Sequence, residues 1–210
     1  MVNITSQRKD LEIMVQFPEL QEIQYSYRPE IMQDVTDRLK FMIGHHCKVL
    51  VMRIDVRFPE KYPHDGKNTD LSELMRQFTQ YFSYHGILCH YTWVREQDSS
   101  DHPHYHIVIF FDGSRVEDGS SIMARASYIW NRIMGVDCWG CIHLCLTSEG
   151  ANGIMIRRPS QKSEGAKLQV ETESFNAAYR ATVEWSSYLA KTRSKGSAPR
   201  CVREYQSSQL

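Results

Sequence analysis

Two histidines stand two residues apart where a strongly apolar segment begins. In the stretch "HYHIVIFFD", His104 and His106 project to the same side of an extended strand, because side chains alternate between the two faces of a strand. Imidazole nitrogens bind divalent metal ions, but such a site needs at least a third ligand. Glu96 lies eight residues before His104 and could return across from it in a hairpin, whereas His102 is an alternative ligand that a proline separates from the strand. The pattern predicts a metal site, with a pair of half-exposed histidines at a sheet edge as the alternative.

A second pair of residues combines a phenol with an ammonium group near the end of the chain. The stretch "WSSYLAKTRSKG" contains Tyr188 and Lys191, and this spacing places both side chains on one face of a helix. Together they could address one phosphate group. The alternative is a surface tyrosine followed by a lysine that is favourably placed at a helix C-terminus.

The segments that would position these residues alternate between strand-like and helix-like patterns. Alternating apolar and polar residues, as in "KVLVMRIDVRF", predict strands, and apolar residues at helical spacing predict helices. The predicted strands cover residues 48–58, 87–97, 104–112 and 141–147, and the predicted helices cover much of residues 1–46, about 70–85, 121–134 and about 174–192. Residues 149–172 have the composition of an irregular or hairpin insertion.

This order of elements predicts an α+β fold of the ferredoxin-like or RRM-like type, a split βαβ sandwich with a mostly antiparallel sheet. Helices would cover one face of the sheet, and the histidines would lie on the open face. We expect three segments: a helical lead-in over residues 1–46 that packs on the core, a main domain over residues 47–196, and a basic, flexible tail over residues 197–210.

Composition narrows the class of protein further. No apolar run is long enough for a membrane helix and the N-terminus lacks a secretory segment, so we expect a cytoplasmic protein with no membrane partner. The six scattered cysteines indicate reduced thiols rather than a disulfide framework. Zero net charge argues against non-specific coating of nucleic acid, although basic residues outnumber acidic ones ten to five over residues 151–210.

The motifs, their order and their flanks resemble the HUH endonuclease superfamily of rolling-circle replication initiators, relaxases and single-strand transposases. More specifically, "HYHIVIFFDG", "YIWNRIMG" and "WSSYLAKTRSKG" look like the prophage YagK/YfjJ family and the replication proteins of the inovirus gene II type. The resemblance covers about residues 45–196.

The resemblance implies a single-strand DNA nickase and ligase with an HUH active site. His104, His106 and Glu96 would hold Mg²⁺ or Mn²⁺ against the scissile phosphate, and Tyr188 would attack to give a 5′-phosphotyrosyl link and a free 3′-OH. A phenol is a poor nucleophile near neutral pH unless its phenolate form is stabilised. The metal ion and Lys191 would provide this stabilisation. We expect a one-tyrosine enzyme, because Tyr179 would face away from Tyr188 on the helix.

The implied partners are single-stranded or hairpin origin DNA and the host replication machinery. Four basic residues could line a path for the DNA strand: Arg53, Arg57, Arg193 and Lys195. The chain contains no Walker-type glycine-rich loop, so a host helicase would have to separate the strands.

A competing signal comes from the stretch "CWGCIHLC". Its possible ligands Cys138, Cys141, His143 and Cys145 could close a structural zinc site, which would favour a non-catalytic, zinc-stabilised nucleic-acid-binding or adaptor protein. The spacing is tighter than in the usual zinc fingers and ribbons, so small buried thiols are the simpler interpretation. A third possibility is an inactive prophage remnant that keeps only the fold.

Overall fold

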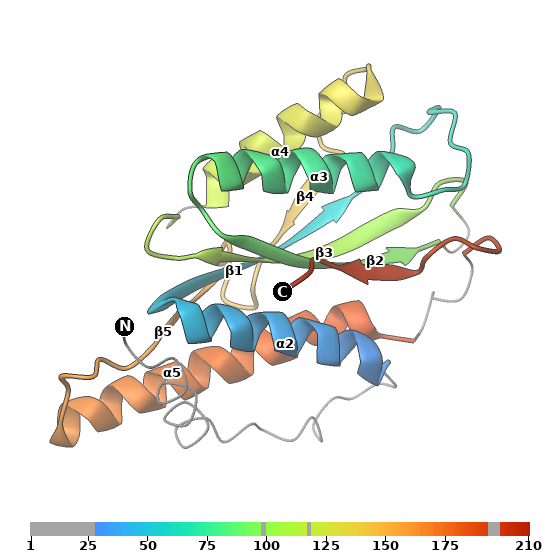
Figure 1. The fold of residues 1–210 in the computed structure, drawn as a ribbon. Helices are drawn as coiled ribbons and strands as arrows, with labels where there is room; N and C mark the ends of the chain where they lie inside the picture. Colours follow the sequence, from blue (N-terminus) through green and yellow to red (C-terminus); the bar gives the residue numbers. More distant parts are fainter. Residues whose placement is uncertain (1–27, 98–99, 117–118, 193–197) are drawn as a thin grey trace.

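A single antiparallel sheet lies between two layers of helices in the computed structural model (Figure 1). The structure describes residues 28–97, 100–116, 119–192 and 198–210. In chain order the elements are α2 (Pro29–His45), β1 (Lys48–Val56), α3 (Thr69–Tyr84), β2 (Cys89–Glu96), β3 (His104–Asp112), α4 (Gly119–Met134), β4 (Ile142–Cys145), β5 (Ile154–Arg157), α5 (Gly165–Ser186), the 3₁₀ turn η2 (Ser187–Ala190) and β6 (Tyr205–Ser207).

The sheet has the strand order β4-β1-β3-β2-β6, and β5 also pairs with β1. All of these pairings are antiparallel, and β2 and β3 form the predicted hairpin. The α+β fold is therefore confirmed. β4 and β5 follow one another along the same edge of β1, opposite residues 53–56 and 48–51 respectively, so the insertion expected over residues 149–172 contributes a short strand. The last helix also begins earlier than predicted, at Gly165.

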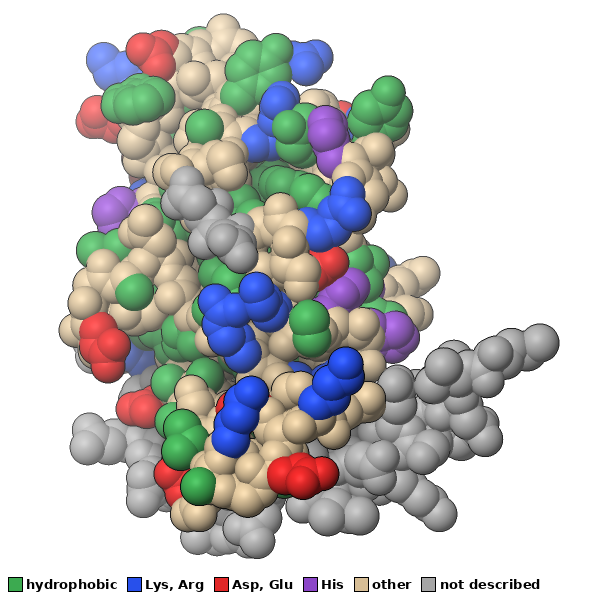
Figure 2. Space-filling model, turned by 90° about the vertical axis from the view of Figure 1, so that its left-hand side faces the viewer, with side chains coloured by type: hydrophobic (Ala, Val, Ile, Leu, Met, Phe, Trp, Pro, Cys, Tyr) green, Lys and Arg blue, Asp and Glu red, His purple; other side chains and the backbone are tan. Residues whose placement is uncertain are grey.

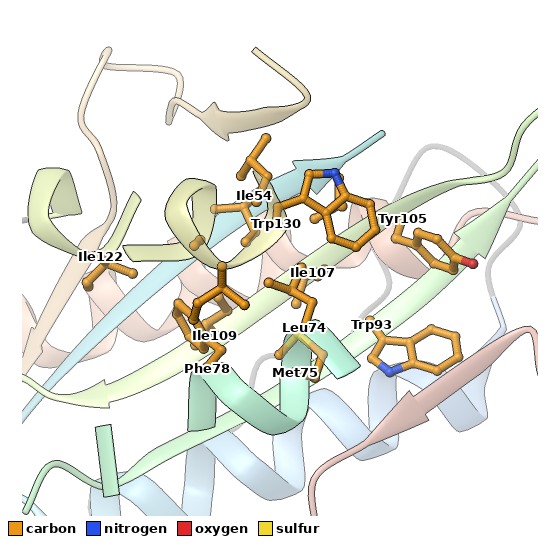
Figure 3. Close-up of a cluster of buried hydrophobic side chains, with 14 of the residues drawn as sticks. Ile54, Leu74, Met75, Phe78, Trp93, Tyr105, Ile107, Ile109, Ile122 and Trp130 are labelled. Carbon is orange, nitrogen blue, oxygen red and sulfur yellow. The ribbon is translucent and has the colours of Figure 1, made fainter. Parts of the chain in front are cut away.

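One face of the sheet packs against α3 and α4 (Figure 3). Every second residue of β3 points into this layer, so that Tyr105, Ile107 and Ile109 are fully buried. Trp130 of α4 is also fully buried, and its indole Nε1 donates a hydrogen bond to the carbonyl oxygen of Arg57 at 2.9 Å. This layer is the larger of the two apolar cores.

The other face of the sheet is not open, and this part of the prediction is wrong. α2 and α5 cover it, and Val108 and Phe110 of β3 are buried there with Leu39 of α2 and Phe175 of α5 (Figure 1). The reason lies in the strands themselves, which carry apolar side chains on both faces over most of their length and therefore need cover on both sides. Among the helices of the described residues, none combines the length and the hydrophobicity required to span a bilayer.

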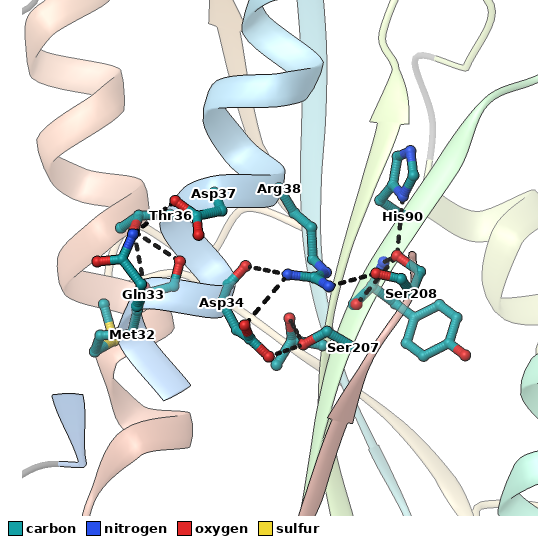
Figure 4. Close-up of polar contacts among 11 residues, drawn as sticks. Met32, Gln33, Asp34, Thr36, Asp37, Arg38, His90, Ser207 and Ser208 are labelled. Carbon is teal, nitrogen blue, oxygen red and sulfur yellow. Dashed lines mark hydrogen bonds and ion pairs between the residues drawn. The ribbon is translucent and has the colours of Figure 1, made fainter. Parts of the chain in front are cut away.

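The C-terminal residues do not form the flexible tail that was expected. Residues 205–207 form β6, which pairs with the outer edge of β2. Polar contacts fasten this strand to α2, because Arg38 donates to the carbonyl oxygen of Ser208 and the Ser207 hydroxyl donates to Asp34 at 2.8 Å (Figure 4). The edge of β2 offers unpaired backbone groups, and β6 satisfies them. The N-terminal lead-in is described only from residue 28, and its helix α2 packs on the sheet as predicted.

Candidate metal centre and nucleophile

The β2–β3 hairpin brings the three predicted ligands together at one end of the sheet. Its register places Glu96 directly opposite His104, as the spacing predicted. Glu96 Oε2 lies 3.4 Å from His104 Nε2 and 3.1 Å from His106 Nε2. Ligand atoms of all three residues lie within 4.8 Å of one another.

These distances fit a divalent cation. Two ligands at right angles, each about 2.1 Å from a metal ion, are about 3 Å apart, which is close to both measured separations. Two imidazole nitrogens and one carboxylate oxygen form a donor set that suits several divalent ions. The cluster could therefore hold a metal ion, and its donor atoms do not by themselves fix which one.

Asp55 supports the cluster from the neighbouring strand, a role that sequence reasoning missed. It lies opposite His106 in the β1–β3 register, and its Oδ1 lies 2.6 Å from His106 Nδ1. An ionised carboxylate can only accept, so Nδ1 donates and Nε2 is directed to the cluster. The Cys145 thiol donates to the same Asp55 oxygen at 3.3 Å. The available signal was the polar alternation of Arg53 and Asp55 along an otherwise apolar strand.

The two carboxylates also set the protonation of the central histidine. Burial lowers the pKa of His106, but hydrogen bonds to Asp55 and Glu96 outweigh it, so that the pKa is raised above its usual value. Burial alone would raise the pKa of Asp55, but the hydrogen bond and charge of His106, the hydrogen bond from Cys145 and the charge of Arg53 together outweigh it and lower that pKa. The two carboxylates therefore favour the protonated imidazole, and a bound cation would take the place of the proton on Nε2.

Tyr188 reaches the same cluster from the end of α5. Its ring lies edge-on to His106, with ring centroids 5.0 Å apart and an interplanar angle of 83°. The α-helix stops at Ser186, and Tyr188 lies in the following 3₁₀ turn rather than on the predicted helix face. Lys191 directly follows this turn, and its Nζ lies 4.2 Å from the centroid of the Tyr188 ring.

The surroundings of Tyr188 combine cations with carboxylates. Arg53 Cζ lies 4.6 Å from the centroid of its ring. Burial raises the pKa of Tyr188, and Glu96 and Asp55 raise it further, while Arg53 acts in the opposite direction. A cation between the phenol and these carboxylates would reverse their effect. Tyr179, by contrast, is buried in the α2/α5 core, as expected for a residue that faces away.

Two other predicted site residues lie elsewhere. His102 is not the third ligand, because its Nε2 is 2.7 Å from the carbonyl oxygen of Tyr62 and its ring lies near Phe58. β3 begins only at His104, after the proline that interrupts the extended chain. Arg57 follows the end of β1 and is exposed. Arg193 and Lys195 lie outside the described residues.

The cysteine-rich stretch does not gather into a metal cluster within the part of the chain that the structure describes. Cys138 donates to Asn131 Oδ1 at 2.8 Å, Cys145 donates to Asp55, and His143 is exposed. Burial raises the pKa of Cys138 to about 11 and that of Cys145 to about 12, which favours neutral thiols. The simpler interpretation, small thiols packed around the sheet, fits these contacts.

Basic side chains gather at the opposite end of β1, on the side shown in Figure 2. Lys48 and Arg157 are direct cross-strand partners, an arrangement of like charges that normally destabilises a sheet. Arg158 follows at once and donates to the carbonyl oxygen of Ile43 at 3.2 Å. Like positive charges therefore lie side by side at this end of β1.

The fold and the cluster define an α+β protein with a two-histidine, one-glutamate site and a tyrosine beside it. The family model of the YagK/YfjJ C-terminal domain matches residues 15–203, and the chain belongs to this family. Comparison with curated proteins and with solved structures gave no match.

Proposed function

We propose that this protein is a metal-dependent single-strand DNA nickase and ligase of the HUH type, which acts as a rolling-circle replication initiator. The observation that carries the proposal is the position of Tyr188, whose ring lies 5.0 Å from that of a histidine in the Glu96–His104–His106 cluster. A phenol, a candidate metal centre and two cationic side chains thus surround one small space. This is the set of groups that attack on a phosphodiester by tyrosine requires.

Each residue of the site would have a separate role in the reaction. Glu96, His104 and His106 would hold Mg²⁺ or Mn²⁺, which when bound polarises a non-bridging phosphate oxygen. Mixed imidazole and carboxylate ligation suits Mn²⁺ at least as well as Mg²⁺. Asp55 keeps the His106 ring oriented, and Lys191 together with Arg53 favours the phenolate form of Tyr188.

The reaction is a transesterification that needs no oxidant, reductant or nucleotide triphosphate. The Tyr188 oxygen forms a bond to phosphorus and loses its proton, while the bond from phosphorus to the 3′ oxygen breaks and that oxygen takes up a proton. The products are a 5′-phosphotyrosyl link and a free 3′-OH. Because the number of phosphoester bonds is unchanged, attack by a 3′-OH on the link reseals the strand.

The substrate class we propose is single-stranded or hairpin origin DNA. Lys48 and Arg157 offer cationic groups at one end of β1, and Arg53 and Lys191 offer cationic groups beside Tyr188. The host helicase and replication machinery would supply strand separation and synthesis.

The decisive experiment is covalent capture. End-labelled hairpin oligonucleotides with randomised loops are incubated with the protein and Mn²⁺, and protein-linked label is measured after denaturation. We expect an adduct with the parent protein, none with Tyr188→Phe, and none after chelation of the metal. Tyr84→Phe is the matched control, because Tyr84 is 88% exposed and lies on α3, and it should form the adduct normally.

Two outcomes would reject the proposal. An adduct that persists in Tyr188→Phe would place the nucleophile elsewhere. Metal binding with no adduct on any oligonucleotide would favour a non-catalytic binding protein or an inactive remnant.

A further inference from the structure

Tyr188 lines a groove to which none of the three metal-cluster residues contributes. It lies between α5 and the connection from β4 to β5, and it has a volume of about 640 Å³. Small side chains of α5, Ala177, Ala178 and Ala181, form part of its wall and leave room for a planar group. Trp185, one turn before Tyr188, also lines it and is half-buried.

Arg53 joins this groove to the proposed reaction site. It is 7% exposed, donates to the carbonyl oxygen of Trp185 at 2.8 Å, and has its Cζ 5.3 Å from the Trp185 ring and 4.6 Å from the Tyr188 ring. Its Nε is buried without a hydrogen-bond partner among the described residues. Arg53 also lines the groove, and a guanidinium beside two aromatic rings is suited to an anionic ligand that carries an aromatic group.

The acidic residues of the groove indicate which part of such a ligand would enter. Glu149 and Glu184 line the groove and are exposed, so they lie at its rim. Carboxylates would repel a phosphate chain that ran along the groove, but they accept hydrogen bonds from the amino groups of bases. The charges therefore favour a phosphate at Arg53 and a base in the groove.

We propose that this groove binds one unpaired nucleotide next to the scissile phosphate, with its base stacked on Trp185 and its phosphate at Arg53. The inference deepens the proposed nickase function, on which it rests, by naming the residues that select single-stranded substrate. A paired base would have to unpair and unstack before it could enter the groove, at a cost of a few kcal/mol, so the groove favours single-stranded over duplex DNA. Stacking is tolerant of base identity, so binding does not need a particular sequence.

The test uses tryptophan fluorescence and needs no catalysis. Trp93 and Trp130 are buried in the α3/α4 core, whereas Trp139 is 86% exposed, so Trp139→Phe leaves Trp185 as the tryptophan within reach of a ligand. We expect a short oligothymidylate to quench the fluorescence of Trp139→Phe, and the same strand in duplex form to leave it unchanged. Adding Trp185→Phe should remove the quenching.

Affinity provides the second measurement. Fluorescence anisotropy of a labelled oligothymidylate should show binding at least about fivefold weaker for Trp185→Ala, and near parent affinity for Trp185→Phe, which keeps a stacking surface. Trp139→Ala is the matched control and should bind as the parent does. Circular dichroism confirms that each variant is folded.

The outcomes separate this inference from the nickase proposal. Absence of oligothymidylate binding, equal binding by Trp185→Ala, or equal binding of duplex would overturn the groove assignment even if the Tyr188 adduct forms. Quenching through Trp185 without any adduct would support the groove and reject the nickase.

Discussion

The two faces of the sheet are built from the same strands but have different contents. On β3, Tyr105, Ile107 and Ile109 point into the α3/α4 layer, while His106 and Val108 point towards α2 and α5. Of the buried polar residues on the strands, Arg95 faces α3 and bonds the loop before it, whereas Arg53, His90, Thr92, Glu96 and His106 occupy the other face.

The α3/α4 layer therefore contributes mainly to the stability of the fold, whereas the candidate site lies in the α2/α5 layer. The α3/α4 layer buries large apolar side chains against one another, which is the main source of folding free energy. The α2/α5 layer has an apolar centre with two polar regions, one where β6 meets α2 and β2, and one where η2 follows α5 and Tyr188 meets the hairpin. A site at the end of one layer can hold charged groups without interrupting the other.

The largest expected effect lies in the apolar layer. Phe111 is fully buried, and its ring centroid lies 4.9 Å from that of Phe82. Phe111→Ala should lower the free energy of unfolding by about 3–5 kcal/mol, because it leaves a cavity in the core. Urea denaturation measures this loss, and Phe111→Leu should lose less. Mn²⁺ affinity of the folded variant should be unchanged, and a large change would contradict the separation of the two faces.

The next effect concerns the polar end of the other layer. His104→Ala should weaken Mn²⁺ binding by at least about a hundredfold, because it removes a direct ligand. Its side chain is 25% exposed, so unfolding free energy should change by only about 1 kcal/mol. Isothermal titration calorimetry and urea denaturation measure the two quantities. His102→Ala is the matched control and should bind Mn²⁺ normally.

The raised pKa of His106 predicts opposite pH trends for metal binding and stability. Protons compete with the metal for Nε2, so Mn²⁺ affinity should fall about tenfold per pH unit below that pKa. Without metal, the contribution of His106 to stability is fully present below its unfolded pKa of about 6.5 and is lost as pH rises through the higher folded value. Titrations with Mn²⁺ and metal-free denaturation across pH 5–9 test both trends. Because His46, His64 and His90 have lowered pKa values and stabilise the fold as pH rises, the stability trend is taken as the difference between the parent and His106→Gln; a difference that grows with pH would contradict the assignment of His106.

The smallest expected effect is at the C-terminal strand. The Ser207 hydroxyl lies 2.9 Å from that of Thr92 and donates to Asp34. Ser207→Ala should lower the unfolding free energy by about 1 kcal/mol, with no change in Mn²⁺ affinity. Ser72→Ala, an exposed position on α3, is the control for urea denaturation and should change stability by less than about 0.5 kcal/mol. Equal losses in both variants would show that β6 contributes nothing specific.

The sequence predicted the parts of this structure that depend on local patterns. Period-two alternation located β1, β2 and β3, and helical spacing located α3 and α4. The hairpin between β2 and β3 then predicted Glu96 opposite His104, since the register of a short hairpin follows from its length. The start of α5 was missed, because residues 165–173 are polar and give little helical periodicity.

Long-range contacts could not be predicted in the same way. Asp55 lies far from His106 in sequence, and only the pairing of β1 with β3 brings them together. The packing of α2 and α5 on the second face of the sheet, and the pairing of β6 with β2, also depend on which surfaces remain available after the sheet has formed.

By itself, the sequence determined the ligand types and the face on which His104 and His106 stand, because side-chain direction in a strand follows from backbone geometry. The tertiary structure determined which other residues contact these two histidines. Packing of α5 across the sheet brings Tyr188 to His106, and strand order brings Asp55, because the free energy of burying apolar surface fixes these positions across the whole fold.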